Sequence, residues 1–289
     1  MQSQSYYVPA QSPWPIVGAI AMFFIAVGAG LTVMQLETAD LSGVVILSLG
    51  VLILLYMLFG WFRHVIQESD KGLYSLQMDR SFKQGMSWFI FSEVMFFFAF
   101  FGALFYARVF SVPWLGGASN NQMTNEVLWP SFESAWPLLN TPAGEVTQAM
   151  PWYGLPLINT VILLTSSVTL HVAHKAIEKN NRKELTAFLS VTVLLGFVFL
   201  GLQVEEYIHA YEALNLTLQS GIYGNTFYLL TGFHGMHVTI GALLLGIVLI
   251  RVIKGHFTEQ KHFAFQAAAW YWHFVDVVWV CLFVFVYVM

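Results

Sequence analysis

The sequence predicts an all-α, polytopic membrane protein with seven transmembrane helices, and composition, segment length and charge placement all lead to it. Of the 289 residues, 57% are hydrophobic and only 10% are charged, whereas soluble domains carry about 25% charged residues. Seven apolar segments reach the length of about 20 residues that a helix needs to cross the hydrocarbon layer. Their expected limits are 16–34, 41–62, 84–109, 152–175, 184–207, 224–250 and 264–288. These runs lack the period-two alternation of a transmembrane β-barrel.

The basic residues predict the orientation of these helices. Eleven of the 12 Lys and Arg residues fall within 63–83, 175–183 and 251–261, and only Arg108 lies elsewhere. Cytoplasmic loops of membrane proteins are enriched in Lys and Arg, so we expect a cytoplasmic N-terminus and a C-terminus on the outer side. Residues 1–15 contain no basic residue, so the first apolar segment is expected to be a retained span rather than a signal peptide.

The chain is expected to form a single membrane domain with two parts. Residues 1–62 hold the N-terminal segment and helices one and two, and residues 63–289 hold a bundle of helices three to seven. A long outer loop covers 110–151. The single cysteine, Cys281, allows neither an internal disulfide nor a cysteine cluster for a metal. Nothing in the chain indicates a nucleic-acid partner.

Two acidic residues are predicted to lie near the middle of the membrane. Glu93 follows Lys83 by ten residues, or about 15 Å of helix, and Asp276 lies about midway along the last segment. A lone charge at that depth costs about 3 kcal/mol or more, so both side chains should face protein or a polar cavity. For Glu93 we keep two interpretations, a protonated packing residue and an acid that exchanges protons.

The histidines allow a haem interpretation. His171 and His174, and likewise His234 and His237, are three residues apart and share a helix face. A bis-histidine haem needs one ligand from each of two helices at matched depth, which His237 and His273 would satisfy. A di-haem membrane cytochrome is therefore one alternative, and hydrogen-bonded core histidines are the other. A secondary transporter is disfavoured because we find no internal repeat.

Several segments resemble subunit III of haem–copper cytochrome c oxidase. They are 262–279 (HFAFQAAAWYWHFVDVVW), 223–227 (YGNTF), 231–238 (TGFHGMHV), and Gly85-Met86 followed by 91–97 (FSEVMFF). The resemblance extends from about residue 61 to the end. It departs from the family pattern at Lys175, His209 and Gln266.

The resemblance implies a subunit of an aa3-type oxidase that transfers electrons from cytochrome c to O₂ and pumps protons. This chain would hold no cofactor, whereas haem a, haem a3 and copper would lie in partner subunits I and II. It would pack directly on subunit I and support assembly, proton uptake and durability. Its first two helices would stand apart from the other five across a V-shaped, lipid-filled cleft. Subunit III of a quinol oxidase is the closest alternative.

The resemblance also implies bound structural phospholipids and a location. Five positions match those expected near lipid headgroups, where each base contributes about 1 kcal/mol to phosphate binding: Arg63, Lys83, Arg251, Lys254 and His256. Glu93 matches the mid-membrane glutamate of the family. The outer loop is longer than in mitochondrial versions, which favours a bacterial inner membrane.

Overall fold

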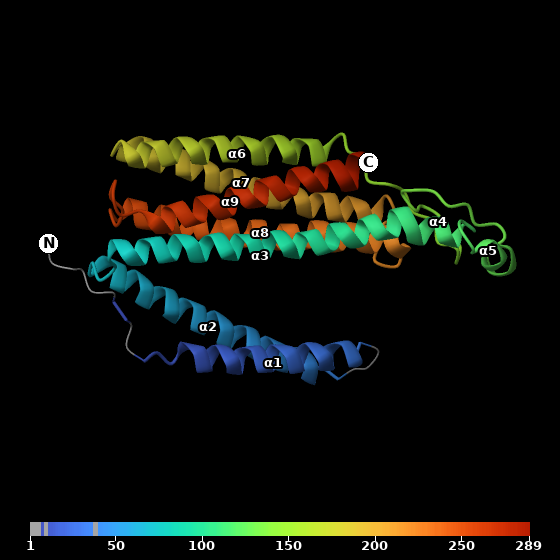
Figure 1. Ribbon diagram of the computed structural model, residues 1–289, viewed down its shortest axis with the longest axis horizontal. Helices are drawn as coiled ribbons and strands as arrows, with labels where there is room; N and C mark the ends of the chain where they lie inside the picture. Colours follow the sequence, from blue (N-terminus) through green and yellow to red (C-terminus); the bar gives the residue numbers. More distant parts are fainter. Residues whose placement is uncertain (1–6, 9–10, 37–39) are drawn as a thin grey trace. The chain divides into compact units, whose positions relative to one another are not determined.

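A computed structural model describes residues 7–8, 11–36 and 40–289 (Figure 1). Within these residues, seven helices are long and apolar enough to cross a membrane, which confirms the predicted number of spans. They are α1 (Trp14–Met34), α2 (Ser42–Asp70), α3 (Leu76–Tyr106), α6 (Leu155–Glu178), α7 (Arg182–Glu212), α8 (Gly221–Ile253) and α9 (Phe263–Leu282).

Several helices extend beyond their predicted limits. α2 continues to Asp70 and α3 begins at Leu76, so Arg63 and Lys83 lie on helices rather than in a loop. Apolar length marks only the hydrocarbon layer, whereas a helix can continue into the headgroup region because its backbone groups stay bonded to one another.

The predicted outer loop 110–151 is partly helical for the same reason. α3 continues through a π-helical turn (Ala107–Ser111) and α4 (Val112–Leu115), and α5 (Gln122–Leu128) follows. The rest of the loop is fixed to the end of α7, because the Gln148 N–H and the Thr147 hydroxyl both donate to the carbonyl oxygen of Leu214, at 3.0 and 3.1 Å.

The chain divides into two compact units, residues 1–82 and 83–289. In the first unit, α1 and α2 form a hairpin whose backbones touch at glycine. A Cβ atom added at Gly28 would lie 2.3 Å from the backbone nitrogen of Leu47, and one added at Gly43 would lie 2.4 Å from that of Thr32. Small residues therefore set the close approach of these two helices, as in many membrane helix pairs.

Polar contacts link the start of α1 to the last turns of α2, at the end of the hairpin opposite its connecting loop. The Trp14 indole N–H donates to His64 Nδ1 at 3.0 Å. The hydroxyls of Tyr7 and Tyr74 both donate to the Glu68 carboxylate, at 3.2 and 2.8 Å. Burial, together with this carboxylate, raises the pKa of Tyr74, so its hydroxyl remains a donor at physiological pH.

In the second unit, α9 is the most enclosed helix. Half of the residues in its most apolar stretch are buried, compared with 28% of those in α6 and in α7. Two of its indoles, Trp272 and Trp279, are completely buried. Trp272 fits because α7 and α8 present glycines to it: a Cβ atom at Gly196 or Gly241 would lie 2.7 or 2.9 Å from its ring.

Gly28 and Gly30 provide a matched test of the hairpin packing. Gly28→Ala should destabilise the first unit by about 1–3 kcal/mol, because the added methyl group overpacks the contact. Gly30→Ala should be neutral or stabilising by up to about 1 kcal/mol, because among the described residues no atom beyond its chain neighbours and the backbone of its own helix lies within 4 Å of its added Cβ. The thermal aggregation midpoint of the tagged chain in detergent should fall for Gly28→Ala alone. Equal midpoints would refute the close backbone contact.

Candidate functional site: polar clusters at membrane depth

Glu93 of α3 pairs with His237 of α8. The Glu93 Oε2 atom lies 2.9 Å from Nε2 of the imidazole, and the His237 Nδ1 atom lies 2.6 Å from the carbonyl oxygen of Phe233. The side chains are 23% and 6% exposed, respectively. Phe96 and Phe97 pack against the imidazole ring, so aromatic side chains of α3 cover His237.

The two hydrogen bonds of His237 constrain its protons. A carbonyl oxygen only accepts, so Nδ1 must carry a hydrogen. Nε2 then either donates to an ionised Glu93 or accepts from a protonated one. Both arrangements have zero net charge and place one proton in the contact between the two side chains. The pair therefore avoids the cost of a lone charge in hydrocarbon.

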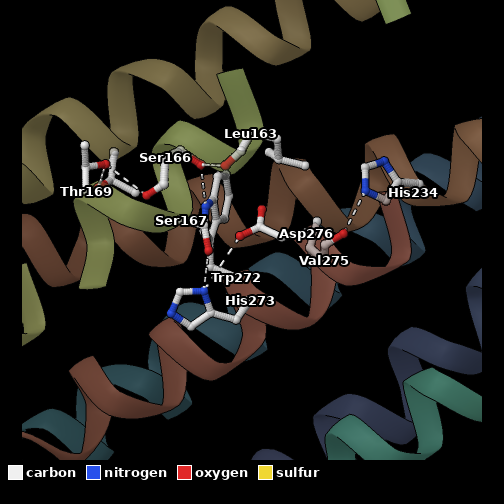
Figure 2. Close-up of polar contacts among 10 residues, drawn as sticks. Leu163, Ser166, Ser167, Thr169, His234, Trp272, His273, Val275 and Asp276 are labelled. Atoms are coloured by element: carbon white, nitrogen blue, oxygen red, sulfur yellow. Dashed lines mark hydrogen bonds and ion pairs between the residues drawn. The ribbon is translucent and has the colours of Figure 1, made fainter. Parts of the chain in front are cut away.

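Asp276 lies in a separate cluster on α9 (Figure 2). Its Oδ2 atom is 3.7 Å from Nδ1 of His273, and the Ser167 hydroxyl of α6 is 2.7 Å from the same nitrogen. The Asp276 side chain is only 5% exposed, whereas that of His273 is 40% exposed. Ser167 and Asp276 thus approach one nitrogen of His273, which differs from a catalytic triad, in which serine and carboxylate bind opposite nitrogens.

Further hydrogen bonds in the same region fix α9 between its neighbours (Figure 2). The Trp272 indole donates to the Ser166 hydroxyl of α6 at 2.9 Å. One turn further along α9, the carbonyl oxygen of Val275 lies 3.2 Å from Nε2 of His234, on α8. The Asp276 cluster is therefore held by helices on both sides.

A third acidic residue at membrane depth was missed by the sequence interpretation. Glu206 is completely buried, and the Tyr287 hydroxyl donates to its Oε1 atom at 2.6 Å. The available signal was its spacing from Phe199, Gln203 and Ala210, which places all four on one buried stripe of α7.

The predicted headgroup ligands all lie within about two turns of a helix end. Arg63 is exposed on α2 in the first unit, and Lys83 is half-buried on α3 at the start of the second. The last turn of α8 and the turn after it carry Arg251, Lys254 and His256. Lys254 and His256 are exposed, whereas Arg251 is half-buried with its guanidinium carbon 4.6 Å from the centre of the Phe257 ring.

The histidines proposed as haem ligands have other partners. Both nitrogens of His237 lie within hydrogen-bonding distance of Phe233 and Glu93, and Nδ1 of His273 contacts Ser167. His174 packs against His262 at a ring separation of 5.8 Å. Among the described residues, no three His, Cys, Asp or Glu side chains converge into a group that would hold a metal ion.

The seven apolar helices define a multi-pass integral membrane protein. Comparison with known proteins assigns its family. The sequence model of the family described as cytochrome c oxidase subunit III matches residues 4–289, and the chain belongs to this family. The resemblance found in its motifs is thereby confirmed, and the chain is a component of a respiratory oxidase complex.

Curated relatives match along nearly the whole chain. The chain is 40% identical to cytochrome c oxidase subunit 3 of Oncorhynchus mykiss over 287 residues, which are 99% of this chain and 97% of the relative. The subunit 3 proteins of Tetraodon nigroviridis and Carassius auratus are 38% and 39% identical with the same coverage.

Proposed function

We propose that this chain is the non-redox subunit III of an aa3-type cytochrome c oxidase. Subunits I and II would carry haem a, haem a3 and copper, and the complex would take electrons from cytochrome c and pump protons. The match to the subunit III family over residues 4–289 carries the proposal. The engagement of both His237 nitrogens within the chain supports it against the di-haem alternative.

Purification of the native complex through a tag on this chain tests the assignment. The chain should be recovered in equal amount with a subunit that contains haem and copper, and the complex should oxidise reduced cytochrome c. A Soret band in the isolated chain would instead support the di-haem cytochrome. Oxidation of a quinol but not of cytochrome c would support the quinol-oxidase alternative.

We also propose a bacterial inner membrane, with the N-terminus in the cytoplasm and the C-terminus in the periplasm. The three basic stretches support this orientation, and the long outer segment supports the bacterial source. A reporter enzyme that is active only in the periplasm should be active when fused after Met289, and inactivity there would reverse the orientation.

Phospholipid binding by Arg63, Lys83, Arg251, Lys254 and His256 is part of the proposal. The exposed ammonium of Lys254 follows α8 directly, where it would meet headgroup phosphates. The half-buried guanidinium of Arg251 packs on Phe257, and this contact would fix its orientation. We also propose that two helices and five helices form separate groups with a lipid-filled cleft between them. This grouping rests on the family resemblance.

Native mass spectrometry of the complex tests the lipid contacts. Lys254→Gln should weaken retention of an anionic phospholipid about fivefold, because one interfacial base contributes about 1 kcal/mol. Lys175→Gln is the matched control, since Glu178 already lies 3.1 Å from the Lys175 ammonium. Equal lipid retention in wild type and both variants would remove Lys254 from the site.

We propose that Glu93, rather than Asp276, is the mid-membrane acid open to exchange. The Glu93 side chain is 23% exposed and that of Asp276 is 5% exposed. An apolar carbodiimide, which reacts with protonated carboxyl groups in hydrocarbon, should therefore label Glu93 first in the purified complex. Peptide mass spectrometry reads out the labelled residue, and labelling confined to Asp276 would contradict this choice.

The Glu93→Gln variant separates a proton role from a structural one. The glutamine amide keeps a donor for Nε2 of a neutral His237, so haem content and electron-transfer rate should stay at the wild-type level. Proton-pumping efficiency or the lifetime of the enzyme during turnover should fall. Loss of haem from the complex would show that Glu93 acts in assembly.

A further inference from the structure

Several buried polar side chains in the second unit have atoms that lack hydrogen-bond partners among the described residues, and three of these side chains lie near one another on α6 and α7. Asn159 of α6 and Glu206 of α7 are completely buried, and Gln203 of α7 is 5% exposed. Among the described residues, no group bonds to either amide atom of Asn159 or of Gln203, or to Oε2 of Glu206. Buried amides and carboxyl groups are almost always hydrogen-bonded, so five such atoms on these three side chains require an explanation.

The packing of α6 against α7 places Asn159 opposite Gln203. Trp272 contacts both Ser166 of α6 and Gly196 of α7, so these two residues lie at the same level of the antiparallel pair. Asn159 precedes Ser166 by seven residues and Gln203 follows Gly196 by seven. Seven residues are nearly two full turns, so both amides lie on the facing sides of their helices at one common level.

Glu206 lies about one turn beyond Gln203 on α7, and Tyr287 bonds to it. Both side chains are therefore closer to the outer surface than the two amides. Gln203 lies beside both the Glu206 carboxyl and the Tyr287 hydroxyl, although neither contact reaches hydrogen-bonding geometry for its amide atoms. Tyr287 also lines a cavity of about 240 Å³ between the outer segment and the end of the chain, together with Trp136, Met150 and Tyr223. The cavity gives solvent an approach to within one side chain of Glu206.

The unpartnered atoms select the kind of ligand. Asn159 Oδ1, Gln203 Oε1 and Glu206 Oε2 are acceptors, whereas Asn159 Nδ2 and Gln203 Nε2 are donors. A metal cation would use the three oxygens and leave both amide nitrogens unsatisfied. Water donates and accepts, and buried waters make about three hydrogen bonds each. We propose that Asn159, Gln203 and Glu206 form a buried water-binding site, supplied from the outer cavity past Tyr287.

High-resolution cryo-electron microscopy of the intact oxidase complex tests the site directly. We expect density for at least one water within hydrogen-bonding distance of the Asn159 and Gln203 amides. A direct bond between the two amides, with no density between them, would overturn the proposal. So would an ion contacting only oxygens at about 2.3–2.6 Å, the distance typical of a bound Ca²⁺.

Radiolytic labelling in ¹⁸O-water provides a second readout that does not depend on resolution. Bound water generates hydroxyl radicals beside it, so Tyr287, which is only 7% exposed, should be labelled in the wild-type complex. Gln203→Met should remove most of the Tyr287 labelling. Thr231→Val is the matched control, because it deletes a buried hydroxyl that bonds Tyr207. Equal labelling of Tyr287 in wild type and Gln203→Met would contradict the site.

Discussion

The lack of hydrogen-bonding partners in hydrocarbon is the constraint on which the second unit depends. A polar side chain of α6–α9 that lies within the hydrocarbon layer needs a partner in the protein or a bound water, since lipid tails supply none. The two buried indoles show how this works, because Trp272 and Trp279 donate to Ser166 and Thr160 of α6 at 2.9 and 3.0 Å. Each bond fixes α9 against α6 at one level, and the two bonds lie seven residues apart on α9 and six apart on α6.

Glycine makes this arrangement possible. Trp272 reaches Ser166 only because Gly196 and Gly241 leave room for its ring. Without a water-driven hydrophobic effect, helix association in membranes relies on such close packing and on interhelical hydrogen bonds. The same residues therefore provide van der Waals contact and define the rotation of α9, which in turn places His273 and Asp276 toward α6.

The polar clusters differ in how accessible their acidic side chains are and in how their protons can be arranged. Asp276 and Glu206 are enclosed, and their contacts are fixed by neighbouring helices. Glu93 is the more accessible acid, and its partner His237 can hold either of two proton arrangements without a change in net charge. A pair that keeps zero net charge in both proton arrangements would suit the proton role that we propose for this subunit. The buried water site proposed at Gln203 would instead have a structural role.

The sequence by itself determined the seven spans, and through its motifs it determined the family. Apolar length and charge placement are local properties, and lipid imposes them directly on each segment. Apolar length did not predict where α2 ends or where α3 begins. Both helices continue past the hydrocarbon layer, because backbone hydrogen bonds hold a helix together whether its side chains are apolar or polar. The mid-membrane depth of Glu93 and Asp276 stays a prediction that rests on counting residues.

Only the tertiary structure decided which side chains meet. Glu93 and His237 are 144 residues apart, Ser167 and His273 are 106 apart, and Glu206 and Tyr287 are 81 apart. Matched depth alone allowed His237 and His273 to be paired as haem ligands, but depth does not specify helix rotation or neighbour. Rotation is set by packing, through contacts such as Trp272 between Gly196 and Gly241. Periodicity in a single helix cannot specify these contacts, since they require the surfaces of several helices at once.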